Sequence, residues 1–191
     1  MGHREDLLEG AKRCLLEKGY ARTTARDIVA ASGTNLASIG YHYGSKEALL
    51  NQAFLAVTED WGDAVGPARR EEVEAAKDPV ARFQKTWEQI IASYEASRAV
   101  WKLQLEVVSR LDDDEKLREA IRVPQAEGRL GLAEEFAGVD AAADPEKARV
   151  AGLFYQALVA GVMIQWLVDP ETAPSAEDLT DGLRAILENK S

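Results

Sequence analysis

Apolar residues recur every three and four positions along nearly the whole chain, and no stretch sustains the strict alternation of a half-buried strand. This spacing is typical of amphipathic helices that bury one face. Glycine, Asp-Pro and Ser-containing breaks interrupt the pattern at regular intervals. The pattern predicts an all-α protein of about nine helices, with three short helices in residues 1–45 and a larger helical body after them.

Capping and breaking residues mark the ends of the first helices. The expected terminators are Gly19, Ser32–Thr34 and Gly44, and the expected N-caps are Thr24 (with Asp27 as its capping-box partner), Asn35 and Ser45. These signals predict a third helix of only about eight residues, from Leu36 to Tyr43, separated from the second by a tight turn.

The later segments show similar signals. The helix that starts near residue 46 is expected to end at Gly66–Pro67, and the segment around Pro124 to be broken or bent, because proline lacks the backbone donor. Asp78–Pro79, Asp144–Pro145 and Ser175 read as the starts of three further helices.

The helix from Pro145 to Val168 is apolar on more than one side, and such a helix must be buried on two faces. One face can serve the core of the chain. The other can pair with the last helix and a second copy in a two-fold interface, predicted to use Ala157, Ala160, Gly161, Ile164, Leu183, Ile186 and Leu187. The alternative is a monomer that encloses this helix entirely within itself.

Charge is distributed unevenly along the chain. The formal net charge is -10, which argues against general nucleic-acid binding. Residues 1–50, however, hold seven Lys and Arg against six Asp and Glu, a charge of +1, so the rest of the chain carries -11. A near-neutral N-terminal region can contact DNA if its cations lie on one face. The longest apolar run is short for a membrane span, no signal core appears, and Cys14 is alone, so we expect a soluble, cytoplasmic protein.

Three helices with a tight turn before the third are typical of a helix-turn-helix DNA reader. The third helix would be roughly 12 Å long, which suits a major groove of about the same width. Ile39 and Tyr43 share a face that can pack on Ile28, Val29 and Leu49. The opposite face offers Leu36, Ala37, Ser38, Gly40, Tyr41 and His42 to DNA. Three packed helices that bind no DNA are the alternative.

The candidate contacts divide by chemistry. Leu36 and Ala37 can meet thymine methyl groups, and Gly40 lets the backbone approach closely. Phosphate contacts are expected from Ser38, Tyr41, His42 and Lys46, and at the start of the second helix from Arg22, Thr23, Thr24 and Arg26.

The segment from Gly19 to Leu50, GYARTTARDIVAASGTNLASIGYHYGSKEALL, resembles the N-terminal signature of the TetR family of transcriptional regulators. The resemblance implies a homodimer that binds a palindromic operator, usually as a repressor released by a small molecule. It places base contacts at Leu36, Ala37 and Gly40 and phosphate contacts at Thr24, Ser38, Tyr41, His42 and Lys46. Many members carry Tyr where this chain has Gly40, so an operator cannot be inferred from relatives.

The family resemblance also implies an effector-binding and dimerisation domain over residues 46–191, joined by helix 46–65 to a DNA-binding domain over residues 1–45. Aromatic and amide side chains in the body are the candidate lining of an effector pocket: Trp87, Tyr94, Trp101, Gln104, Gln125, Tyr155 and Trp166. The alternative is that these aromatic residues simply form the core.

Two other functions compete with this interpretation. A carboxylate-bridged metal enzyme would need Glu-x-x-His pairs, and neither His3 nor His42 follows a Glu at that spacing. A dimeric helical adaptor that binds a protein partner is the second alternative. We therefore expect a ligand-responsive DNA-binding regulator that is not an enzyme and has no metal or cofactor.

Overall fold

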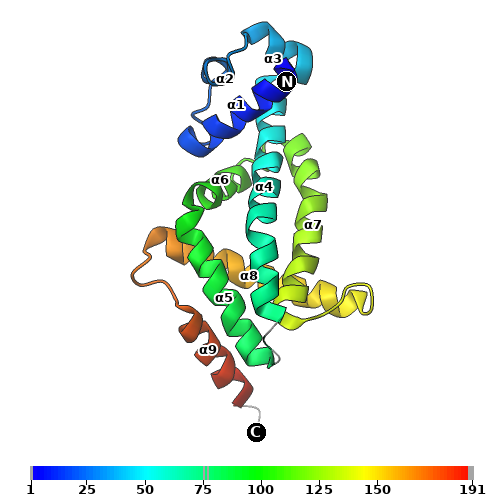
Figure 1. Cartoon of the computed structure of the whole chain (residues 1–191), viewed down its shortest axis with the longest axis vertical. Helices are drawn as coiled ribbons and strands as arrows, with labels where there is room; N and C mark the ends of the chain where they lie inside the picture. The colour runs from blue at the N-terminus through cyan, green and yellow to red at the C-terminus, as the bar shows by residue number, and fades with distance from the viewer. Residues whose placement is uncertain (1, 75, 77, 189–191) are drawn as a thin grey trace. The chain divides into compact units, whose positions relative to one another are not determined.

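The computed structural model describes the backbone of residues 2–188 apart from residues 75 and 77. This described part contains nine α-helices and no strand, as the pattern predicted (Figure 1). Their bounds are α1 His3–Lys18, α2 Ala25–Ser32, α3 Leu36–Tyr43, α4 Lys46–Glu74, α5 Pro79–Ala96, α6 Arg98–Val108, α7 Glu115–Ala137, α8 Pro145–Val168 and α9 Ala176–Glu188.

The chain divides into two compact units, and two helices run from one unit into the other. The first unit consists of Met1–Ala64 and Ala99–Ile121, and the second of Val65–Arg98 and Arg122–Ser191. The first unit thus joins α1–α3 to most of α4, to α6 and to the start of α7. This division follows packing, whereas the predicted division at residues 45 and 46 is one of function and stays a prediction.

The first unit has one apolar core. Its buried members come from all the helices of the unit, and they are Leu7, Ala11, Cys14, Leu15, Tyr20, Ile28, Ile39, Leu49, Leu50, Ala53, Phe54, Val57, Leu103, Val107 and Leu117. Ile39 is buried, and Tyr43 and Val29 pack against this core, as their spacing predicted. Burial of Ile39 fixes which face of α3 points outward.

Side-chain caps set the ends of the short helices. The Thr24 hydroxyl accepts from the Asp27 N–H at 3.2 Å, and the Asp27 carboxylate accepts from the Thr24 N–H at 2.8 Å. Asn35 accepts from the Ser38 N–H at 3.1 Å, and Gly33 ends α2 in the left-handed conformation. These hydrogen bonds confirm the predicted caps. The caps could be predicted from the sequence because the two residues of each cap lie three positions apart.

The predicted end of α4 at Gly66–Pro67 needs correction, and of the two outcomes predicted at Pro124, a break or a bend, the structure excludes the break. α4 continues through Gly66 and Pro67 to Glu74, and α7 contains Pro124 without ending there. Proline has a backbone φ that fits a helix, and it removes only one hydrogen bond, so a long helix can continue past it at a cost. The predicted linking helix 46–65 is therefore the first part of a longer one.

The second unit is built around aromatic side chains from α5, α7 and α8. The Phe136 and Tyr155 rings stack with centroids 4.4 Å apart, and Phe136 also contacts Trp87 at 5.3 Å. Phe83 contacts Trp87, Phe136 and Tyr155, which joins the three helices. α9 packs against α5 and buries Thr180, whose hydroxyl donates to the Ala176 carbonyl.

Helix α8 is long and apolar enough to cross a membrane by length and composition, and 22% of its most apolar window is buried. The uninterrupted apolar run in the sequence is shorter than this helix. A core helix of a soluble protein meets the same criterion. The finding to explain is therefore the apolar surface that α8 exposes in a single copy of the chain.

Candidate DNA-binding surface

The outward face of α3 carries the side chains predicted to read bases together with Tyr41, which is predicted to contact a phosphate. Leu36 is 53% exposed and Tyr41 is 86% exposed, while Ala37 and Gly40 are exposed beside them. A Cβ built at Gly40 would meet no atom within 4 Å. The helix thus presents a thin surface, which lets its backbone approach a base edge closely.

The remaining predicted contacts on this side are half-buried. Ser38, His42 and Lys46 lie at the rim of the α3 face, and the Tyr41 and His42 rings meet edge-on with centroids 4.8 Å apart. The Lys46 ammonium donates to the Thr23 carbonyl at 3.3 Å and lies 3.4 Å from Glu47. A partly exposed ammonium held in this way can still reach a phosphate oxygen.

The start of α2 supplies a second exposed group. Arg22, Thr24 and Arg26 are exposed, and the Arg22 Nε donates to the Lys18 carbonyl at 2.8 Å. Together with the positive end of the α2 dipole, these side chains form a cationic edge beside α3 in the first unit.

Thr23 does not fit its predicted role. Its side chain is 1% exposed, and its hydroxyl donates to the Gly19 carbonyl at 2.7 Å and to the Cys14 carbonyl at 3.2 Å. Because both bonds lie inside the unit, Thr23 fixes the connection between α1 and α2 and is left out of the contact set. The sequence could not separate Thr23 from Thr24, since both are threonines in the same motif.

A charged pair supports the cap of α2. Hydrogen bonds from the Lys18 ammonium and from Thr24 hold the pKa of the Asp27 carboxyl well below its usual value of 3.8. The Lys18 ammonium in turn has its pKa raised by Asp27. The carboxylate is therefore charged at neutral pH, where it also stabilises the positive end of α2.

Several residues that hold α1–α3 in place were missed by the sequence analysis. The Tyr20 hydroxyl donates to the Asn51 side chain at 2.5 Å, and the Asn51 amide donates to Asp114 at 3.1 Å. Burial raises the pKa of Tyr20 to about 12, so its hydroxyl stays protonated as a donor. Glu106 on α6 contacts the α1–α2 connection as well. These partners lie far apart in the sequence, and no local spacing reveals them.

The predicted effector residues fall in different surroundings. Trp87 and Tyr94 are fully buried in the second unit, where the Tyr94 hydroxyl donates to the Val159 carbonyl at 3.2 Å. Trp166 lies 5.6 Å from Tyr94, and the Arg98 guanidinium lies 5.3 Å above the Trp166 ring. The other members are Gln125, exposed on α7, Tyr155, half-buried on α8, and Trp101 and Gln104, which belong to the first unit.

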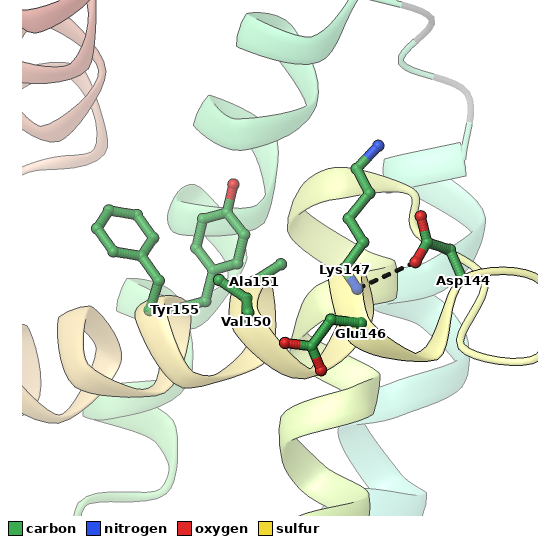
Figure 2. Close-up of a pocket in the computed structure, with 7 residues that line it drawn as sticks. Asp144, Glu146, Lys147, Val150, Ala151 and Tyr155 are labelled. Atoms are coloured by element: carbon green, nitrogen blue, oxygen red, sulfur yellow. Dashed lines mark hydrogen bonds between the residues drawn. The ribbon is translucent and has the colours of Figure 1, made fainter.

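A pocket of about 670 Å³ opens along the first half of α8. It is lined by Asp144, Glu146, Lys147, Val150, Ala151, Phe154 and Tyr155, and Figure 2 shows these side chains along one helix. Of the seven predicted effector residues, Tyr155 lines this pocket. Its carboxylates and aromatic rings suit an organic cation, while Lys147 opposes one.

The predicted pairing face is largely uncovered in one copy of the chain. Ile164 is 48% exposed, Ile186 65% and Leu187 51%, and Ala157, Ala160 and Gly161 are also exposed on α8. Leu183 is half-buried. The same side of α8 also exposes Phe154 and Val168, which the sequence analysis did not select.

Comparison with known proteins assigns the class of this fold and surface. Residues 7–53 match the family described as bacterial regulatory proteins, tetR family, and residues 79–189 match the BetI-type transcriptional repressor, C-terminal. Together these matches span the helix-turn-helix region and the body. The chain belongs to the TetR family of transcriptional regulators, a family of regulators rather than enzymes.

Individual relatives agree with this assignment. The HTH-type transcriptional repressor AcnR of Corynebacterium efficiens is 40% identical over 57 residues, which are 30% of this chain and 28% of that protein. A transcriptional regulator from Rhodococcus sp. Rha1 shares the fold with a TM-score of 0.64 and 22% identity, over 94% of both chains. A protein from Saccharomonospora viridis, solved in complex with choline, has a TM-score of 0.67 and 22% identity over 97% of this chain and 95% of its own.

Proposed function

We propose that this regulator is a homodimeric repressor that binds a palindromic operator through α3 and leaves it when a small-molecule effector binds. The exposed outer face of α3, beside the cationic edge of α2, is the observation that carries the DNA-binding part of this proposal. In it, residues 1–45 read DNA, residues 46–191 bind the effector and the second copy, and the protein acts in the cytoplasm.

The contacts divide into those that read bases and those that fix position. Leu36, Ala37 and Gly40 face the major groove, because they are exposed and carry little that would hold the backbone away. Phosphates are bound by a set that surrounds this face, namely Arg22, Thr24, Arg26, Ser38, Tyr41, His42 and Lys46.

A second copy of the chain covers the exposed face of α8 in this proposal. The small residues Ala157, Ala160 and Gly161 allow close approach, and the larger apolar side chains around them leave water on pairing. A dimer explains this apolar surface without a membrane. Two-fold pairing also presents two copies of α3 to the two halves of a palindromic site.

The effector binds in the pocket along the first half of α8, beside Tyr155. Choline is the first probe to test, because a protein of the same fold was solved with choline and because Asp144 and Phe154 suit an ammonium group. Choline should quench tryptophan fluorescence and release the protein from DNA over the same concentration range. If choline leaves both signals unchanged, it is not the effector.

Fluorescence anisotropy with labelled duplexes tests the DNA-binding proposal directly. The intergenic DNA beside the gene for this protein should bind at least about a hundredfold more tightly than a scrambled duplex at the same salt concentration. Equal binding of the two duplexes up to micromolar protein would reject operator recognition, whatever the result with an effector.

A further inference from the structure

Helix α6 holds the connection between α1 and α2 through one carboxylate. The Glu106 side chain accepts from the Tyr20 N–H at 2.9 Å and from the Ala21 N–H at 2.6 Å, one bond to each oxygen. These two backbone donors belong to the short segment that ends α1 and precedes α2. A residue about 85 positions away thus satisfies two consecutive amides of the helix-turn-helix region.

Gly19 makes room for this contact. A Cβ at Gly19 would lie 2.5 Å from a Glu106 carboxylate oxygen, closer than non-bonded Cβ contacts come, so the Glu106 side chain would have to shift away. Gly19 also has a φ of +80°, a conformation that other residues rarely adopt. Gly19 therefore both ends α1 and admits the carboxylate to the amides that follow.

The same connection is held from other sides of the first unit. The Arg110 guanidinium lies 4.6 Å above the Tyr20 ring, and Tyr20 is 2% exposed. The Tyr20 hydroxyl is bound to Asn51 of α4, which in turn binds Asp114 at the start of α7. Glu106 is thus one of several groups, from α4, α6 and the segment between α6 and α7, that fix where this connection lies.

A carboxylate at this place is electrostatically unfavourable for DNA binding. Glu106 bonds to Tyr20 and Ala21, directly before the proposed phosphate contacts Arg22 and Thr24, and a negative charge there repels phosphate. The compensating gain is strength, because hydrogen bonds to an ionised acceptor are about twice as strong as those to a neutral one. This balance favours a role in holding geometry over a role in contacting DNA.

We propose that Glu106 is a positioning residue for operator binding. From α6, the Glu106 carboxylate holds residues 20 and 21 in place, and through them it fixes the start of α2 and the orientation of α3. Glu106 itself touches no nucleic acid. Without it, the α1–α2 connection moves away from the arrangement that fits DNA for part of the time. This inference rests on the proposed DNA-binding function.

Variants E106A and E106Q test the inference against wild type by anisotropy on the intergenic duplex over a series of salt concentrations. If only about a tenth of the E106A chains keep the α1–α2 connection in the arrangement that fits DNA, operator affinity falls about tenfold for each DNA-binding domain that binds. E106Q keeps one oxygen acceptor and should fall between E106A and wild type. The slope of log affinity against log salt stays the same for all of them, because the phosphate contacts are unchanged.

E115Q is the matched control. Glu115 is exposed at the start of α7 in the same unit, and its replacement removes the same charge without touching the α1–α2 connection. E115Q should bind DNA as tightly as wild type or slightly more tightly, because the chain becomes less negative. Circular dichroism at the assay temperature shows whether each variant is folded.

The outcomes separate the two proposals. If wild type binds its intergenic duplex and a fully folded E106A binds as tightly as E115Q, the positioning role is wrong while operator binding stands. The positioning role is also wrong if the affinity loss of E106A is no larger than its unfolded fraction explains. It is wrong as well if the salt slope of E106A differs from that of wild type by about one. If wild type shows no preference for the duplex, the proposed function fails first and the positioning role falls with it.

Discussion

Neighbouring residues of one motif have different roles because the fold places them differently. Thr23 is buried and its hydroxyl donates to carbonyls of its own unit, whereas Thr24 next to it is exposed at the start of α2. Sequence reasoning found the motif and correctly placed its cap. It could not assign the two hydroxyls, because burial depends on how α1 and α2 pack, and that packing is not visible in the local pattern.

Lys46→Ala tests a proposed phosphate contact, which fixes the position of the protein on DNA without reading bases. The variant should bind all duplexes more weakly, and the slope of log affinity against log salt should become shallower by about two for the proposed dimer, because one phosphate contact is lost from each subunit. Anisotropy titrations between about 50 and 200 mM salt measure this slope. Lys116→Ala, which removes an exposed lysine from the start of α7, should leave the slope unchanged.

Leu36→Gln tests a reading contact. The exposed side chain contributes little to folding, so the variant should remain as stable as wild type. Its preference at one base pair of each half-site should change, with a cost of about 1–3 kcal/mol for the original base and an unchanged salt slope. Competition among operators with single substitutions measures the preference. If Leu36→Gln and Lys46→Ala had the same effects, the division between reading and positioning would be wrong.

The ends of elements were predictable where they depend on residues three or four positions apart. Thr24, Asn35 and Asp78 cap their helices as the sequence indicated, since each side chain reaches an amide in the first turn. The end predicted at Pro67 and the break considered at Pro124 were wrong, because a helix of more than twenty residues can lose one hydrogen bond and continue. Glu106 and Asn51 were invisible to this reasoning, because only the tertiary fold brings them to Tyr20.

Asp27→Asn tests the cap of α2 through its pH dependence. The folded-state pKa of Asp27 lies below its unfolded value of 3.8, so the carboxylate stabilises the fold above that pH, and this advantage is lost as the pH falls below it. The variant should melt at a lower temperature than wild type at pH 5 and pH 7 alike, and the difference should shrink below about pH 3.8. Thermal melts followed by circular dichroism measure both. A constant difference down to pH 3 would show that charge is not the cause, and Asp113→Asn, in an exposed turn, serves as the control.

At the scale of the whole molecule, α8 exposes an apolar side, and in the proposed dimer this side is where two copies of the chain associate. The sequence predicted a two-sided apolar helix, and the structure shows which side a single copy leaves uncovered. The sequence could not decide whether a second copy or the chain itself covers that side, because this depends on how the surrounding helices pack.

Ile164→Glu tests this association. A glutamate in the pairing face would be buried twice in a two-fold interface, and we expect dimer affinity to fall at least about a hundredfold, because each unpaired buried charge costs several kcal/mol. Sedimentation should give twice the 20.9 kDa of one chain for wild type and about one chain for the variant. Val123→Glu, at a position 57% exposed on α7, should remain a dimer. A dimeric Ile164→Glu variant would place the interface elsewhere.

The uncovered side of α8 also has a consequence for how the regulator responds to its own abundance. If only the dimer binds both half-sites, and most chains are monomers, promoter occupancy rises with the square of the number of chains in the cell. A modest change in synthesis would then switch the target gene sharply, even when no effector is present.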